Sequence, residues 1–207
     1  MFQVSKVEPD FFKRAVSKVN NPKQSSAWSD SNIKGIREDL RNHILNDEQG
    51  GLCIYCEVKV DDTHVEHYKT RSHFPQLTLE YDNLIVSCND NNHCAKYKDN
   101  KYKISKDAYV KFINPVLENP QDFLDYTAYG EICAKGNLNE IDIEKAEKTI
   151  EILNLNYKSL VEDRKRVADC VLYVKDDIKI LDDMYYLKNY KTYKIWIFEN
   201  LIKGVAI

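Results

Sequence analysis

Two pairs of cysteines constrain this chain more than any other feature of its sequence. Cys53 and Cys56 form a C-x2-C pair, and Cys88 and Cys94 supply a second pair after an interval of 31 residues. Structural Zn²⁺ is held tetrahedrally by four such ligands, and two close pairs from separate segments are the usual way to supply them. We therefore expect a closed structural zinc site, so any chemistry has to come from other residues.

Other interpretations of these cysteines explain the pattern less well. A redox C-x-x-C pair would predict a thioredoxin-like βαβ context, which is absent around Cys53. A set of unrelated buried thiols is a second alternative. His93, directly before Cys94, is an alternative zinc ligand.

The composition describes a soluble globular protein, with 43% hydrophobic and 30% charged residues among 207. No apolar run approaches the roughly 18 residues of a membrane span, and the N-terminal residues lack the apolar core of a secretory signal. We expect a single domain over residues 1–207, a cytoplasmic location and no membrane partner. The net charge of −3 argues against a chain that grips nucleic acid over its whole surface, so such binding would need a local patch or a partner.

Hydrophobic spacing divides the chain into three parts. Apolar residues recur at intervals of three and four in residues 28–50, which predicts an amphipathic helix. Short apolar pairs separated by Cys, His, Asn and Asp mark residues 52–111 as a small module, and the helical pattern returns over residues 141–207. The expected fold class is α+β and mainly helical.

A His-Glu-His element lies between the two cysteine pairs. It places His64, Glu66 and His67 within four residues. In isolation such an element is more often a polar strand or turn with solvated side chains. Its place inside the cysteine-bracketed segment, together with His73, favours a chemical role.

These motifs, together with Asn83 and Lys98, resemble the HNH endonuclease motif, which forms a ββα-metal fold. The resemblance extends to the bacterial PtuB family, the HNH components of Septu antiphage systems and of retron-associated defence modules. The matching segments are residues 51–57, 64–68, 72–75, 113–115 and 149–156. The resemblance implies a zinc-stapled ββα-metal module at residues 52–111, embedded in a helical scaffold.

The resemblance also assigns roles to the central residues. It makes His67 the general base that takes a proton from the attacking water. It makes Glu66 a ligand of a catalytic Mg²⁺ or Mn²⁺ ion, and Asn83 the residue that braces the loop and orients the base. His64 is expected to orient the phosphate, assist the metal ion or serve as a hydrogen-bond partner.

The sequence departs from the family pattern at one metal ligand. Many HNH enzymes have His or Asn directly after the last zinc cysteine, where this chain has Ala95, although Lys98 keeps its place three residues later. Because alanine cannot bind a metal ion, the missing ligand is expected to be His93, Asn100 or a water molecule.

A basic stretch follows the second cysteine pair. Its lysines are interleaved with tyrosines, which suits phosphate contacts and stacking on unpaired bases. A solvated charged face is the alternative. The lysines expected to bind nucleic acid are Lys96, Lys98, Lys101 and Lys103.

The expected function is metal-dependent cleavage of phosphodiester bonds in bacterial antiphage defence. The family resemblance implies a PtuA-like ABC-type ATPase as partner, DNA or RNA as substrate, and in a retron setting a reverse transcriptase with its RNA–DNA product. Two alternatives stay open: an HNH-type ribonuclease that acts on structured RNA such as tRNA, and a non-catalytic zinc-finger module that only binds.

Overall fold

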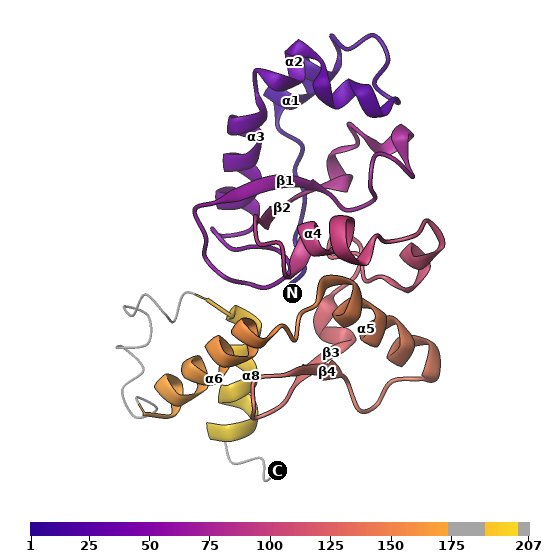
Figure 1. Cartoon of the computed structure of the whole chain (residues 1–207). Coiled ribbons are helices and arrows are strands. Elements are labelled where there is room, and N and C mark those ends of the chain that lie inside the picture. Colours follow the sequence, from indigo (N-terminus) through magenta and orange to yellow (C-terminus); the bar gives the residue numbers. More distant parts are fainter. Residues whose placement is uncertain (174–188, 203–207) are drawn as a thin grey trace.

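The computed structural model describes residues 1–173 and 189–202, and it is a mainly helical α+β structure with two small sheets (Figure 1). One half contains α1 to α3 and the β1–β2 hairpin, and the other contains α5, α6, α8 and the β3–β4 hairpin, with α4 between them. The helices are α1 (Asp10–Val16), α2 (Ser31–Lys34), α3 (Arg37–Asn42), α4 (Cys94–Lys96), α5 (Glu140–Leu153), α6 (Lys158–Tyr173) and α8 (Lys191–Ile197). The strands are β1 (Thr63–His67), β2 (Leu84–Cys88), β3 (Leu124–Tyr126) and β4 (Ile132–Ala134).

The segment predicted as one helix over residues 28–50 is a series of short helical turns. Asp30 starts α2 by accepting a hydrogen bond from the Asn32 backbone N–H at 2.8 Å. Gly35 ends α2 after four residues, because glycine is a poor helix former. The apolar spacing nevertheless identified the buried face, since Leu40 and Ile44 are both fully buried.

The β1–β2 hairpin lies between two hydrophobic cores. Every residue of strand β2 is buried. Ile85 joins the core that contains the first cysteine pair, whereas Leu84 and Val86 join the core beneath α1 to α3. Since β1 pairs with β2 along its whole length, the residues of β1 are fixed against this double core.

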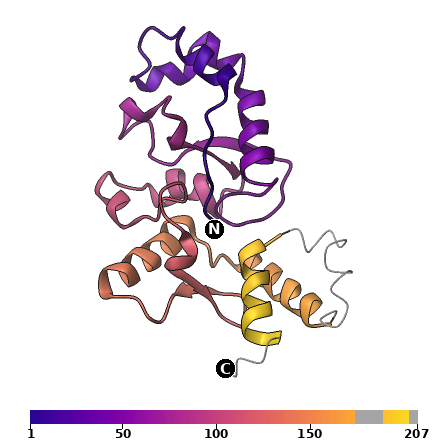
Figure 2. The same ribbon diagram turned by 180° about the vertical axis from the view of Figure 1, so that it is seen from behind.

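In the C-terminal part, α5 and α8 pack on the β3–β4 hairpin. The described residues of the segment predicted to be helical, 141–173 and 189–202, contain α5, α6 and α8. Viewed from behind, α8 crosses α6 and packs against it (Figure 2). Within α8, Tyr193 and Trp196 stack with ring centroids 5.9 Å apart, so these aromatic side chains contribute to a core. Residues 174–188 and 203–207, including Tyr185 and Tyr186, lie outside the described part.

Buried charges join the two halves. The Glu57 carboxylate, directly after the first cysteine pair, accepts the Met1 ammonium group at 2.5 Å and the Thr192 backbone N–H at 2.8 Å. Within the C-terminal half, Arg164 on α6 is also buried and donates to the backbone oxygen of Leu155 at 2.8 Å. None of the helices in the described ranges has the length and apolar character needed to span a bilayer.

Candidate functional site

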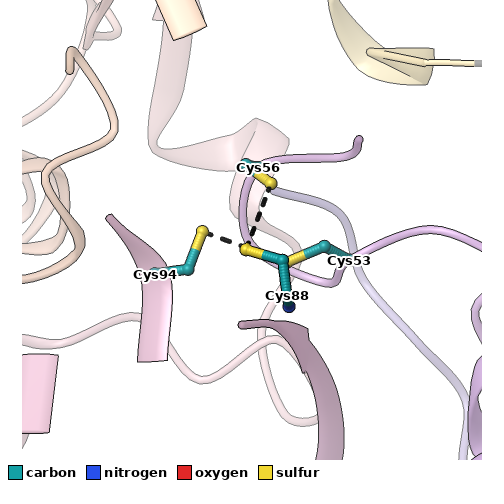
Figure 3. A group of neighbouring side chains, drawn as sticks. All are labelled: Cys53, Cys56, Cys88 and Cys94. Carbon is teal, nitrogen blue, oxygen red and sulfur yellow. Dashed lines mark hydrogen bonds between the residues drawn. The ribbon is translucent and has the colours of Figure 1, made fainter. Parts of the chain in front are cut away.

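The four cysteines predicted to bind zinc come together in the core. Their sulfur atoms all lie within 4.8 Å of one another, and all four residues are buried (Figure 3). The Cys53–Cys94 and Cys56–Cys88 sulfur pairs are 3.9 and 4.0 Å apart. Tetrahedral Zn–S bonds of about 2.3 Å imply sulfur–sulfur distances of roughly 3.8 Å. The cluster therefore has the chemistry and the size of a structural zinc site.

Local backbone geometry sets the direction of these thiols. The first pair lies in a tight turn in which the Glu57 backbone N–H donates to the Cys53 oxygen at 2.9 Å, and Glu57 has a φ of 62°. Cys94 has a φ of 59°, in the left-handed region that non-glycine residues rarely occupy. The Cys88 backbone N–H points at the Cys53 sulfur at 3.3 Å, a contact that favours a thiolate.

His93 belongs to the surroundings of this cluster. Its Nδ1 lies 3.1 Å from the Cys94 sulfur and 3.7 Å from the Cys88 sulfur. The ring is buried, and proximity to the cluster raises its pKa against the opposing effect of burial. His93 is thus placed to interact with zinc-bound thiolates.

The His-Glu-His element forms strand β1 and lines a cleft of about 840 Å³. His64, Glu66 and His67 all contribute to its wall. The 70–73 loop and the segment around Asp99 form the other sides, with Trp28 from the N-terminal half. The cleft is larger than two other surface hollows, of about 470 and 510 Å³, that the described residues form.

The ring of His67 is fixed by two contacts. Nε2 lies 2.9 Å from the backbone oxygen of Thr78, and because a carbonyl oxygen only accepts, Nε2 carries the proton. The Trp28 ring meets the imidazole edge-on, with centroids 4.7 Å apart. Burial, reinforced by the positive charge of Arg71, lowers the pKa of His67 to about 3. His67 is therefore a neutral imidazole whose Nδ1 has a free lone pair.

Asn83 connects the strand to the loop that holds His67. Its amide nitrogen donates to the backbone oxygens of Lys69 and Leu77, each at 3.0 Å, and its amide oxygen accepts the Lys69 N–H at 2.8 Å. Leu77 is adjacent to Thr78, the partner of His67. Asn83 therefore braces both ends of the loop that orients the imidazole.

Glu66 is a buried carboxylate with a buried cationic partner. The Lys98 ammonium lies 2.8 Å from Glu66 Oε1 and 2.5 Å from Asp99 Oδ1, and neither the Glu66 nor the Lys98 side chain is more than 4% exposed. Burial raises the pKa of Glu66 to about 7 although Lys98 opposes the shift. Burial lowers the pKa of Lys98, but the two carboxylates outweigh it and raise the pKa overall. One ammonium group thus links two carboxylates at the cleft.

Comparison with known proteins identifies relatives of this chain. It is 30% identical over 152 residues to a protein named as a candidate HNH endonuclease of retron Vc95 from Vibrio cholerae serotype O1 biovar El Tor, a match that covers 71% of this chain and 72% of the relative. The chain belongs to this HNH family.

Septu proteins are also related to it. The Septu protein PtuB of Bacillus thuringiensis is 29% identical over 136 residues, covering 64% of this chain and 44% of PtuB. The Septu protein PtuA of Bacillus mycoides (strain KBAB4) is 26% identical over 145 residues, covering 56% of this chain and 19% of PtuA. The chain thus spans less than half of the length of either Septu protein. No protein-family model matches the chain.

In this HNH chain the residues expected to supply the missing metal ligand lie elsewhere. Ala95 is fully buried, in α4. His93 faces the cysteines and does not line the His67 cleft, and Asn100 is exposed and also absent from its wall. Asp99, the residue between Lys98 and Asn100, does line the cleft.

The predicted basic stretch is only partly available to nucleic acid. Lys98 is fully buried and paired with carboxylates, so it cannot act as an exposed phosphate contact. Lys101 donates to the side chain of Asn92 at 2.8 Å, outside the cleft. Lys103 lines the cleft, and the charge of Lys96 acts on His64, whose pKa is lowered mainly by burial.

Several cleft residues were missed by sequence reasoning. Asp99 has no role in the HNH motif, although it directly follows Lys98 of that motif. Trp28 and Arg37 lie outside the cysteine-bracketed segment, and no spacing in the sequence connects them to His67. Arg71 lies four residues after His67, within that segment, but it belongs to none of the matching motifs. Only the tertiary arrangement brings Trp28 and Arg37 to the site.

Proposed function

We propose that the chain is a metal-dependent HNH endonuclease that hydrolyses phosphodiester bonds of nucleic acid. The observation that carries the proposal is the state of His67: a neutral imidazole whose Nε2–H is fixed on the Thr78 carbonyl, beside a buried carboxylate in an open cleft. The β1, β2 and α4 elements with the four-cysteine cluster support a zinc-stapled ββα-metal module embedded in a helical scaffold.

His67 is the general base of the proposed reaction. Its Nδ1 takes a proton from the water that attacks phosphorus, and the bond from phosphorus to the leaving oxygen breaks. The leaving oxygen then takes a proton from solvent. Asn83 positions the base through the 69–77 loop, and the low pKa keeps His67 unprotonated at neutral pH.

The cleft contains ligands that suit Mg²⁺ or Mn²⁺. Glu66 and Asp99 supply carboxylate oxygens, and His64 Nε2 lies 3.9 Å from Glu66 Oε2. The two carboxylates already share one cation, the Lys98 ammonium, so this position favours positive charge. A divalent ion held there would stabilise the negative charge that develops on the phosphate. Asp99 takes the ligand role that the sequence suggested for His93 or Asn100.

The similarity to Septu proteins supports a defence function with an ATPase partner. Because the net charge is −3, the chain is poorly equipped to attract polyanions without help. A PtuA-like ATPase would supply additional substrate binding and would control when the nuclease acts. In a retron setting the reverse transcriptase and its RNA–DNA product would accompany it. Both DNA and RNA are candidate substrates, since hydrolysis of a phosphodiester does not select between them.

A cleavage assay tests the proposal. Zinc-loaded chain would be incubated with duplex DNA, single-stranded DNA and structured RNA such as tRNA, with and without the ATPase, in Mg²⁺, Mn²⁺ or no divalent ion. We expect strand scission that depends on the divalent ion and is lost in the His67→Ala variant. Binding without cleavage under every condition would refute the proposal and favour a non-catalytic zinc-finger module.

A further inference from the structure

A second groove continues from the cleft that holds His67. It is about 510 Å³ and is lined by Arg37, Glu38 and Arg41 of the helical half, together with Trp28, His64 and Val65. The last three residues also line the first cleft, so the two hollows meet over β1 and Trp28. Neither Glu66 nor His67 lines the second groove.

Two arginines flank this passage, and the Glu38 carboxylate that also lines the second groove pairs with Arg41. Arg37 lies over the Trp28 ring, 4.8 Å from its centroid, and donates to the Trp28 backbone oxygen. Arg71 lines the first cleft and donates to the backbone oxygen of Ser25 at 3.3 Å. In the described part of the chain neither guanidinium forms an ion pair, whereas nearby Arg41 lies 3.9 Å from Glu38.

The positive charges of Arg37 and Arg71 also act on each other and on His67. Burial lowers the pKa of Arg37, and the positive charge of Arg71 lowers it further, so the two guanidinium groups repel each other. The Nε of Arg37 is buried without a hydrogen-bond partner. An anion that accepts hydrogen bonds from both guanidinium groups would relieve this repulsion.

We propose that Arg37 and Arg71 bind a backbone phosphate that neighbours the scissile phosphate, so that the nucleic-acid strand passes from the His67 cleft over Trp28 into the second groove. Guanidinium groups suit this task because their planar N–H donors match phosphate oxygens. Trp28 is only 9% exposed, so it acts as the wall that holds Arg37 and not as a platform for base stacking. The inference rests on the proposed function, because it takes nucleic acid as the ligand.

Binding measured without cleavage tests this site separately from the reaction. Fluorescence anisotropy would follow a fluorescein-labelled oligonucleotide, as single-stranded DNA, single-stranded RNA and duplex DNA, with the full chain in the His67→Ala background and no added divalent ion. Three further changes would be compared: Arg37→Gln with Arg71→Gln, Arg71→Gln alone, and Arg37→Lys with Arg71→Lys. The matched control is Arg166→Gln, which removes one positive charge from an exposed side chain on α6 that pairs with Asp163 at 2.8 Å.

The double Gln variant should bind about tenfold more weakly or worse, because charged hydrogen bonds are lost. The loss should be similar for different base sequences, and the slope of log affinity against log salt should become shallower by about one, as for one lost phosphate contact. The double Lys variant keeps the charge and should retain the slope, and the control should match its parent. If the melting curve shows that Arg37→Gln perturbs folding, the single variant Arg71→Gln is used to test the site.

Unchanged affinity and salt slope in the Gln variants would overturn the inference, as would failure of the parent protein to bind any of the oligonucleotides. The two proposals can fail independently. If the chain cleaves nucleic acid and the two arginines do not affect binding, the proposed function is supported and the phosphate site is refuted. If binding depends on the arginines but the chain never cleaves, the phosphate site is supported and the proposed function is refuted.

Discussion

Removal of the Asn83 side chain tests how the His67 loop is held. Asn83→Ala deletes two donated hydrogen bonds and one accepted hydrogen bond, at 3.0, 3.0 and 2.8 Å. At about 1 kcal/mol for each bond, the free energy of unfolding should fall by about 3 kcal/mol. For a chain of this size that corresponds to a decrease in Tm of roughly 6–12 °C.

Asn83→Asp separates the bonds from the volume of the side chain. It keeps the acceptor for the Lys69 N–H, but a carboxylate cannot donate to the backbone oxygens of Lys69 and Leu77, so we expect it to be at least as destabilising as alanine. Urea unfolding of zinc-loaded protein measures the free energy, with the exposed Asn20→Ala as control. If Asn83→Ala lowers the free energy of unfolding by less than about 0.5 kcal/mol, as an ordinary surface substitution does, the bracing role is refuted.

Three other changes test separate parts of the structure. Lys98→Met leaves the buried Glu66 carboxylate unpaired and should cost about 3–5 kcal/mol, and the added change Glu66→Gln should restore much of it in urea unfolding. Burial raises the pKa of Glu66 to about 7 although Lys98 opposes the shift, so without Lys98 the pKa rises further. The Lys98→Met protein should therefore lose stability as the pH rises from 4.5 to beyond 7, where the unfolded state ionises more fully than the folded state. Gly130→Ala should lower Tm, because Gly130 has a φ of 83° and an added Cβ would lie 2.9 Å from the Val161 oxygen. Cys88→Ser should lose the zinc found by elemental analysis and unfold at a lower temperature, since the site links separate segments.

The convergence of the four cysteines could be predicted from the sequence. Cysteine spacing is informative because few arrangements satisfy four thiolates, and Cys53, Cys56, Cys88 and Cys94 do converge. The family resemblance assigned roles to Glu66 and His67, and both residues line one cleft. The cysteines and this pair lie within one short segment whose local geometry largely determines their positions.

The remainder depends on contacts between distant segments. Burial of Lys98 follows from its packing beneath Glu66, whereas its sequence neighbourhood resembles a solvated basic stretch. Arg37 and Arg71 are 34 positions apart in the chain, and no periodicity relates them. The helix over residues 28–50 is broken where Gly35 ends α2 and Ile36, with a φ of −114° and a ψ of 3°, leaves helical geometry before α3 begins.

The most direct test of the central claim compares wild-type protein with His67→Ala in the cleavage assay, after both have been shown to contain one zinc ion and to melt cooperatively. Loss of a general base is expected to lower the cleavage rate by about 10²–10⁴-fold. We predict that loss with zinc content unchanged. Cleavage by His67→Ala at the wild-type rate would mean that other residues carry the reaction, and would contradict the role proposed for His67.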